Sequence, residues 1–141
     1  MKISLYILFI LAALVLGAVG CNRNNGDIGA WFGTWQLVSI TDLSGELIPM
    51  GNTVIVKFQN DIIQTTRQFG HYDSEEYYAN WRESGKKLVI DGVGKSIAPE
   101  LHLPGNSVVE LEIVRRPATV MVWKYVDAEG NGYEYNLKRL Y

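Results

Sequence analysis

The sequence is poor in the residue types that build most catalytic and metal centres. Among 141 residues there is one cysteine, and there are two histidines. A single cysteine excludes an intramolecular disulfide and a cysteine metal site, so stability must come from packing. Gly-x-Ser-x-Gly, His-Glu-x-x-His and phosphate-loop motifs do not occur. The sequence therefore predicts a protein that is not an enzyme and that needs no metal or cofactor.

Two groups of side chains could form a metal site or an acid–base pair. His71, Asp73 and Glu75 lie on one side of an extended segment and could bind a metal, but solvated loop charge is the favoured interpretation. Glu110 and Glu112 share one face of a strand, and that face is assigned to solvent. They are therefore predicted to be surface carboxylates rather than an acid–base pair.

The N-terminus carries an export signal. Lys2 is followed by an apolar run without charge, which ends in small residues and the only cysteine. Gly20-Cys21 resembles the end of a bacterial lipoprotein signal, where the cysteine is lipidated, with palmitate an expected acyl chain. We expect a helical signal peptide at 1–20, a flexible Asn- and Gly-rich tether at 21–30 and a domain at 31–141. An uncleaved membrane anchor is the alternative.

The predicted location of the protein is the cell envelope. "NRNNGD" after the cleavage site lacks an acidic run, which favours an outer membrane facing the periplasm. Removal of residues 1–20 leaves 12 basic and 15 acidic side chains, a net charge of −3. This acidic balance disfavours nucleic acid and an anionic membrane surface as partners.

The mature part reads as an all-β domain. Short runs rich in Val, Ile, Thr, Tyr and Trp alternate with turn signals, and no helical period persists. Eight strands are predicted, at 33–41, 53–59, 62–69, 75–82, 87–91, 107–114, 118–126 and 133–140. Short and long connections alternate between them, so an antiparallel meander has one closed end and one end with irregular loops. We expect a small up-and-down barrel with its function at the loop end.

Pairing across the tight turns assigns the strand faces. Counting sets Phe58 opposite Ile63, Trp81 opposite Leu88 and Ile113 opposite Val120. On the seventh strand this turns Val120, Val122 and Lys124 inward. It turns Met121, Trp123 and Tyr125 outward.

The first and last strands resemble those of lipocalin and lipocalin-like proteins. Gly33-Thr34-Trp35 matches the Gly-x-Trp that opens their first strand, and Arg139 matches the Arg of their last strand. The likeness covers nearly all of 31–141, and small lipocalin-like domains occur on bacterial lipoproteins. It implies that Arg139 packs over Trp35 at the closed end of a barrel, a contact of about 0.5 to 2 kcal/mol.

Two functions remain open on these grounds. The first is a carrier or sensor for a small lipophilic ligand, with Arg67 and Lys124 facing an acidic head and with Trp81, Phe58 and Leu111 along its tail. It requires a connected cavity of about 300 Å³ or more inside the barrel. The second is an envelope module with a filled core that binds protein or glycan through outer aromatics, chiefly Trp123 and Tyr125.

The lipoprotein prediction is tested by replacing Cys21 with Ser. Because serine cannot accept the thioether-linked lipid, the variant is expected to be released from the membrane or to keep its signal uncut. Membrane fractionation and the mass of the N-terminal peptide measure both. A variant that stays processed and membrane-bound contradicts the prediction.

Overall fold

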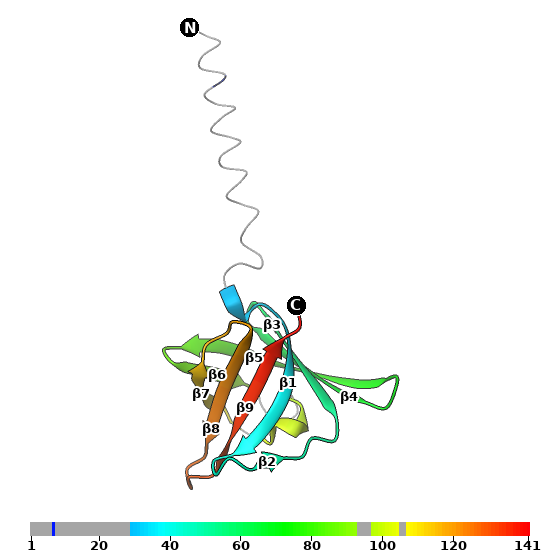
Figure 1. Ribbon diagram of the computed structural model, residues 1–141. Coiled ribbons are helices and arrows are strands. Elements are labelled where there is room, and N and C mark those ends of the chain that lie inside the picture. The colour runs from blue at the N-terminus through cyan, green and yellow to red at the C-terminus, as the bar shows by residue number, and fades with distance from the viewer. Residues whose placement is uncertain (1–6, 8–28, 93–96, 105–106) are drawn as a thin grey trace.

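The computed structural model describes residue 7 and residues 29–92, 97–104 and 107–141 (Figure 1). Apart from residue 7, the predicted signal peptide lies outside these ranges, as do Cys21 and nearly all of the tether. Among the described residues, no helix is long and apolar enough to cross a membrane. The elements are η2 (Gly29–Trp31), β1 (Gly33–Asp42), β2 (Leu47–Ile48), β3 (Thr53–Gln59), β4 (Ile62–Phe69), β5 (Asp73–Ser84), β6 (Lys87–Asp91), η3 (Pro99–Leu101), β7 (Val109–Arg115), β8 (Val120–Val126) and β9 (Gly132–Arg139).

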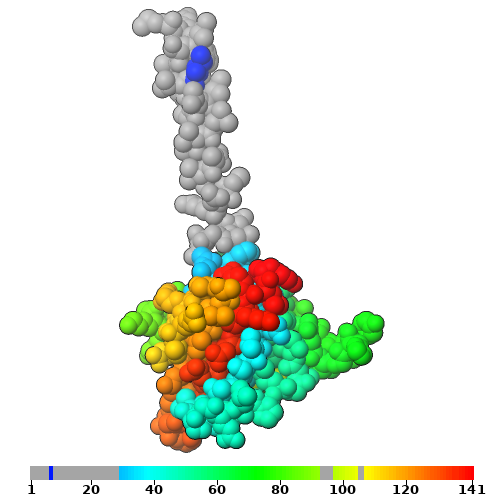
Figure 2. All heavy atoms as spheres, in the orientation of Figure 1, coloured from blue at the N-terminus to red at the C-terminus, as the bar shows by residue number. Residues whose placement is uncertain are grey.

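The strands form one antiparallel meander that closes on itself. Consecutive long strands pair in chain order, and β1 also pairs with β9. The predicted all-β fold, an eight-stranded up-and-down barrel, is confirmed; the two-residue β2 is an addition that pairs only with β1. We call the end at which β1 begins the closed end and the opposite end the mouth. The β4–β5 hairpin projects sideways from the barrel (Figure 2).

Trp35 and Arg139 meet where the first and last strands join. The two residues are register partners, and the guanidinium carbon of Arg139 lies 4.5 Å from the centroid of the fully buried Trp35 ring. This is the contact that the lipocalin resemblance implies. At Gly33, φ is +133°, and an added Cβ would lie 2.8 Å from the Tyr141 carbonyl oxygen, so a larger residue would push the strands apart.

Hydrogen bonds fix the same joint. Arg139 donates from Nε to the Ala118 carbonyl and from Nη1 to the Phe32 carbonyl, each at 3.0 Å, and from Nη2 to Ala30. The Trp35 indole donates to the Trp31 carbonyl at 3.1 Å. One guanidinium therefore ties β9 to the segment before β1 and to the turn between β7 and β8.

The face assignment of β8 is wrong, because β7 contains a bulge. Ile113 pairs with Trp123 rather than with Val120, and the register shifts at Val114. A bulge changes the count by one residue, and an odd shift exchanges the two faces of the partner strand. Met121 and Trp123 are consequently in the core, with no exposed surface, and Lys124 lies on the outer face.

A register shift by an even number of residues leaves the same face of the strand buried. Trp81 pairs with Ile90 instead of Leu88, two residues from the predicted partner, and remains on the inner face. Phe58 pairs with Ile63 as predicted. A second bulge, at Val38 in β1, places Ile40 in the core in place of its polar neighbours Ser39 and Thr41.

The closed-end joint generates a stability prediction. Replacing Trp35 with Ala removes a fully buried indole and the surface on which Arg139 rests, so we expect a loss of about 3 to 5 kcal/mol in the free energy of unfolding. Denaturant unfolding measures this loss. Tyr72→Ala is the control, because Tyr72 is 98% exposed, and it should change stability by less than about 0.5 kcal/mol.

Candidate functional site

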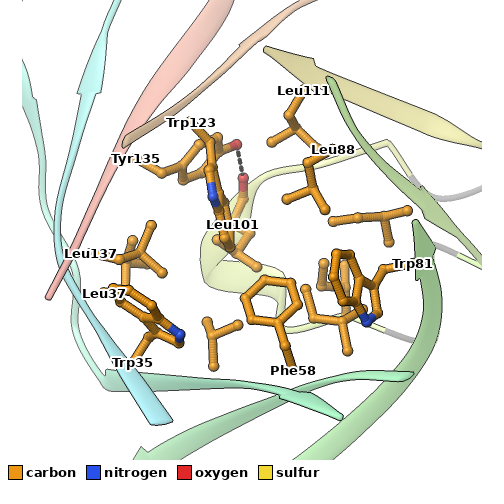
Figure 3. Close-up of a cluster of buried hydrophobic side chains, with 14 of the residues drawn as sticks. Trp35, Leu37, Phe58, Trp81, Leu88, Leu101, Leu111, Trp123, Tyr135 and Leu137 are labelled. Atoms are coloured by element: carbon orange, nitrogen blue, oxygen red, sulfur yellow. Dashed lines mark hydrogen bonds between the residues drawn. The ribbon is translucent and has the colours of Figure 1, made fainter. Parts of the chain in front are cut away.

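The segment after β6 enters the mouth of the barrel and fills its centre. Its described part includes residues 97–103, which we call the plug. Ile97, Ala98 and Leu101 are buried, and Leu101 has no exposed surface. Figure 3 shows Leu101 in the middle of the core, between Trp123 on one side and Phe58 and Trp81 on the other. The interior is thus occupied by side chains of a connecting segment as well as by those of the strands.

Local geometry explains how the plug turns inside the mouth. Pro99 begins the single turn η3, where its fixed φ favours a helix start, and His102 ends it with φ at +52°. The buried Thr65 hydroxyl accepts a hydrogen bond from the Ala98 backbone N–H at 2.9 Å. Tyr135 donates its hydroxyl to the Leu101 carbonyl at 2.5 Å. These bonds satisfy backbone groups that would otherwise be buried without partners.

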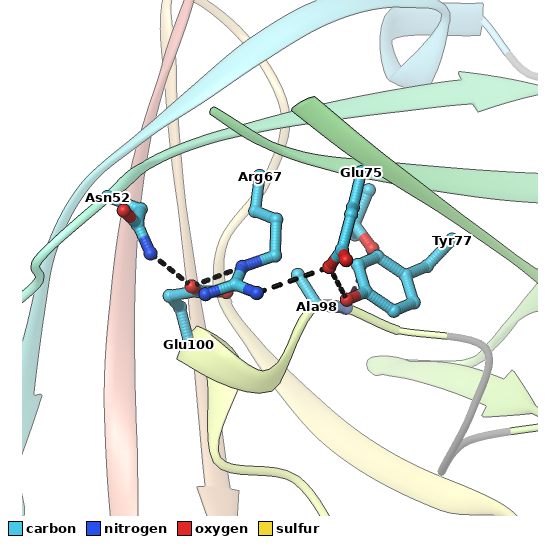
Figure 4. A network of polar contacts seen from close by, with 7 residues as sticks. Asn52, Arg67, Glu75, Tyr77, Ala98 and Glu100 are labelled. Carbon is cyan, nitrogen blue, oxygen red and sulfur yellow. Dashed lines mark hydrogen bonds and ion pairs between the residues drawn. The ribbon is translucent and has the colours of Figure 1, made fainter. Parts of the chain in front are cut away.

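A polar network holds the plug to the rim. The Glu100 Oε1 atom accepts from Arg67 Nε at 2.7 Å and from Asn52 Nδ2 at 2.9 Å (Figure 4). Arg67 also donates from Nη1 to Glu75 at 3.1 Å, and the Tyr77 hydroxyl donates to the same Glu75 oxygen at 2.6 Å. These five residues, from the start of β3, from β4, from β5 and from the plug, are called the Glu100 network.

The network shifts the ionisation of its members. Burial is the largest single influence on Glu100 and raises its pKa, but hydrogen bonds from Asn52, its own backbone and Arg67 together lower the pKa below its usual value. Tyr77 and then Arg67 lower the pKa of Glu75. Hydrogen bonds to Glu75 and Glu100 raise the pKa of Arg67. At neutral pH the plug is therefore held by a charged pair.

Three buried polar atoms have no hydrogen-bond partner among the described residues. They are the indole nitrogens of Trp81 and Trp123 and the second carboxylate oxygen of Glu100. A buried donor or acceptor without a partner costs about 1 to 3 kcal/mol. The plugged barrel thus leaves polar groups in its core and at its mouth that a different occupant could satisfy.

The predicted ligand residues occupy different places. Phe58, Leu111 and Trp81 are inside the barrel, as expected. The cleft at the mouth has a volume of about 230 Å³ and is lined by Arg67 with Pro49, Met50, Gly51, Pro99, Glu100 and His102. This volume is below the roughly 300 Å³ that the carrier hypothesis requires, because the plug occupies the space at the mouth. Lys124 does not join these residues: it lines an outer cleft of about 450 Å³, so its predicted inward position is wrong.

The outer aromatic face predicted for a protein or glycan partner is also wrong. Trp123 is fully buried, and Tyr125 is half-buried and packs against the core. The hypothesis of an outer aromatic surface assumed that these residues of β8 face outward, and the bulge in β7 turns them inward.

The structure does not bring His71, Asp73 and Glu75 together as a set of metal ligands. Glu75 is bound to Arg67 and Tyr77, and the described residues contain no cluster of three or more potential metal ligands. Glu110 forms an ion pair with Lys87 at 3.0 Å on the surface.

Sequence reasoning missed Glu100 and Leu101. The available signal was the apolar pair Leu101 and Leu103 inside a long connection, since a loop on a surface has little reason to carry them.

Comparison with known proteins supports the fold. No protein-family model matches the sequence, and no curated protein matches it. A lipocalin-like protein from Bacteroides uniformis is similar in structure, with a TM-score of 0.60, 14% identity, and coverage of 79% of this chain and 100% of that one. An uncharacterized protein from Bacteroides eggerthii has a TM-score of 0.54 and 14% identity, with coverage of 75% and 98%. The chain therefore has a lipocalin-like barrel fold.

The Glu100 network generates a pH prediction. The folded pKa of Glu100 lies below the usual value of 4.5, so the stability it contributes is present above that pH and is lost as pH falls through the folded pKa. Glu100→Gln should be less stable than the wild type at about pH 6 but should lose less stability on acidification to about pH 3. Urea midpoints at both pH values measure this. Glu129→Gln, at an exposed turn, should behave as the wild type does.

Proposed function

We propose that the domain is a non-enzymatic carrier or sensor for a small amphipathic acid, and that the plug occupies the ligand site in the absence of ligand. The observation that carries this proposal is the placement of two consecutive residues. Glu100 puts a carboxylate on Arg67 at the mouth, and Leu101 puts an aliphatic side chain into the barrel. A fatty acid would present the same two groups in the same order.

The head-group site rests on Arg67. Its side chain is about a quarter exposed, so a carboxylate from outside can reach it, and Asn52 supplies a second donor beside it. A ligand carboxylate that replaces Glu100 keeps both hydrogen bonds, which are of the charge-assisted and stronger kind. Displacement also frees the buried Glu100 oxygen that lacks a partner. The exchange therefore conserves the main polar contacts.

The tail site is the space that the plug vacates. Ile97, Ala98 and Leu101 are the buried side chains that would leave, and together they match a tail of roughly eight to ten carbons. Each buried methylene of the ligand contributes about 0.8 kcal/mol. Phe58, Trp81, Trp123 and Leu111 would then contact the tail. The fully packed strand core leaves no room for long chains.

The plug reduces the apparent affinity by competing for the site. When only a small fraction of molecules is open, the measured dissociation constant rises by the inverse of that fraction. Weakening the plug without changing Arg67 should therefore strengthen binding. This separates the proposal from a barrel whose centre is permanently filled.

The proposed place of action is the cell envelope. Support comes from the sequence of the N-terminus, where the apolar run meets Cys21. A lipid anchor there would keep the barrel at a membrane, which is both the source and the destination of amphipathic acids.

Binding of decanoate and of 1-decanol to the full chain in mild detergent tests the ligand proposal. Glu100→Gln should bind decanoate several-fold more tightly than the wild type, because a neutral amide competes less well for Arg67. Arg67→Gln should lower the ratio of decanoate to decanol affinity about tenfold or more, because it removes a charge-assisted hydrogen bond. Titration calorimetry and native mass spectrometry measure both effects.

Lys124→Gln is the matched control, since it removes the same charge from the outer face and should leave the ratio unchanged. If neither compound binds the wild type or Glu100→Gln, the carrier proposal fails. Equal losses for decanoate and decanol in Arg67→Gln would show that Arg67 does not recognise the head group.

A further inference from the structure

The charges of the barrel are separated along its axis. Cationic side chains gather at the closed end, where β3, β5, β7 and β9 end and β6 begins: Lys57, Arg82, Lys86, Lys87, Arg115, Arg116, Lys138 and Arg139. The acidic side chains at this end are Asp61 and Glu83, together with Glu112 and Glu110 on β7, which lie opposite Lys87 and Val89 of β6. Carboxylates gather toward the mouth: Asp42, Glu46, Asp73, Glu75, Glu76, Asp91, Glu100, Asp127, Glu129 and Glu134. A chain that is acidic on average therefore has one strongly basic end.

Several of the closed-end cations are available for a partner. Lys87 pairs with Glu110, Arg116 pairs with Glu83, and Arg139 is bound to backbone carbonyls. The remaining exposed cations form no ion pair within the described ranges: Arg82, Lys86, Arg115 and Lys138.

Apolar side chains are exposed at the same end. Phe32 is 40% exposed, and Leu140 and the aromatic Tyr141 are exposed beside it at the end of the chain. Aromatic rings next to basic residues suit the boundary between lipid head groups and acyl chains.

The chain toward Cys21 leaves from this end. η2 and the C-terminal residues lie together at the closed end in both whole-molecule views (Figures 1 and 2). Gly29 is eight positions after Cys21, and a fully extended chain covers at most about 3.6 Å per residue, or about 29 Å over these eight steps. An anchor at Cys21 thus confines the closed end, rather than the mouth, to the neighbourhood of the membrane.

We propose that the closed end is a docking surface for anionic phospholipid head groups, so that the barrel stands on the membrane with its mouth directed away from it. The proposal rests on the membrane anchoring inferred above, but it does not depend on any ligand in the barrel. Each Lys or Arg near an anionic surface strengthens binding by about fivefold, equivalent to about 1 kcal/mol, and its removal weakens binding by the same factor. The acidic mouth is repelled by the same surface. The net charge of −3, which disfavoured an anionic membrane as partner, is a sum over two ends of opposite charge.

The experiment compares two probes at opposite ends of β8. The full chain with Cys21→Ser has no other thiol, and a fluorophore is attached at Ala118→Cys or at Ala128→Cys. Ala118 is exposed in the closed-end turn, and Ala128 is exposed in a turn at the mouth. Because the serine variant carries no lipid, it is prepared with residues 1–20 uncut, and this apolar run anchors it in the vesicles. The vesicles consist of phosphatidylcholine, with or without about one third phosphatidylglycerol, and contain a head-group spin label as quencher.

The probe at 118 is expected to be quenched about twofold or more over the probe at 128 in the anionic vesicles. The difference should shrink in pure phosphatidylcholine and at about 0.5 M salt, where charges are screened. Lys138→Glu should reduce it, whereas Lys124→Glu, an identical charge change on the outer face nearer the mouth, should not.

Equal quenching of the two probes, or stronger quenching at 128, overturns the docking surface. So does a difference that is independent of lipid charge, salt and Lys138→Glu, because such a result would show that the anchor alone keeps the closed end near the membrane. Decanoate binding is measured without vesicles, so failure of the carrier proposal and failure of the docking surface are seen separately.

Discussion

Closure of the barrel depends on the joint between β1 and β9, and Arg139 is the residue that holds it. Its guanidinium lies on the Trp35 ring and donates to three backbone carbonyls from two separate segments. The strand order then leaves no edge between the first and last strands, so neither needs protection against pairing with another chain. Closure also sets the interior volume, which six large aromatic side chains from the strands and η2 already occupy in large part: Trp31, Trp35, Phe58, Trp81, Trp123 and Tyr135.

The narrow interior gives the plug its significance. With so many rings inside the barrel, the remaining space at the mouth accepts the buried plug side chains Ile97, Ala98 and Leu101 and little else. The plug is held by side-chain bonds at the rim and by two bonds to Thr65 and Tyr135, whereas the strands are held by continuous ladders. Elements with few backbone ladder bonds open at lower free energy than the sheet around them. The proposed exchange of the plug for an amphipathic acid would therefore cost less than opening the strands of the barrel.

The two proposals place the functions at opposite ends. The mouth carries Arg67 within a field of carboxylates, which disfavours acids that cannot also bury a tail. The closed end carries the basic residues and the chain toward the proposed anchor. A barrel standing on its closed end would present the plug to the aqueous compartment. Charge separation thus links the orientation of the domain to the side from which a ligand arrives.

The sequence by itself determined the barrel and its closed end. Alternation of side chains with period two is a local property. The hairpins at Asn60 and Gly85 contain no odd register shift, so the predicted buried faces of their strands are correct. Gly33, Trp35 and Arg139 predicted the joint between β1 and β9. Only the tertiary structure decided which face of β8 is buried, because the bulge at Val114 changes the parity of the count and thereby places Trp123 in the core. It also decided that Glu100 and Leu101 enter the mouth, since the space they fill is defined by all the strands together and by no local pattern.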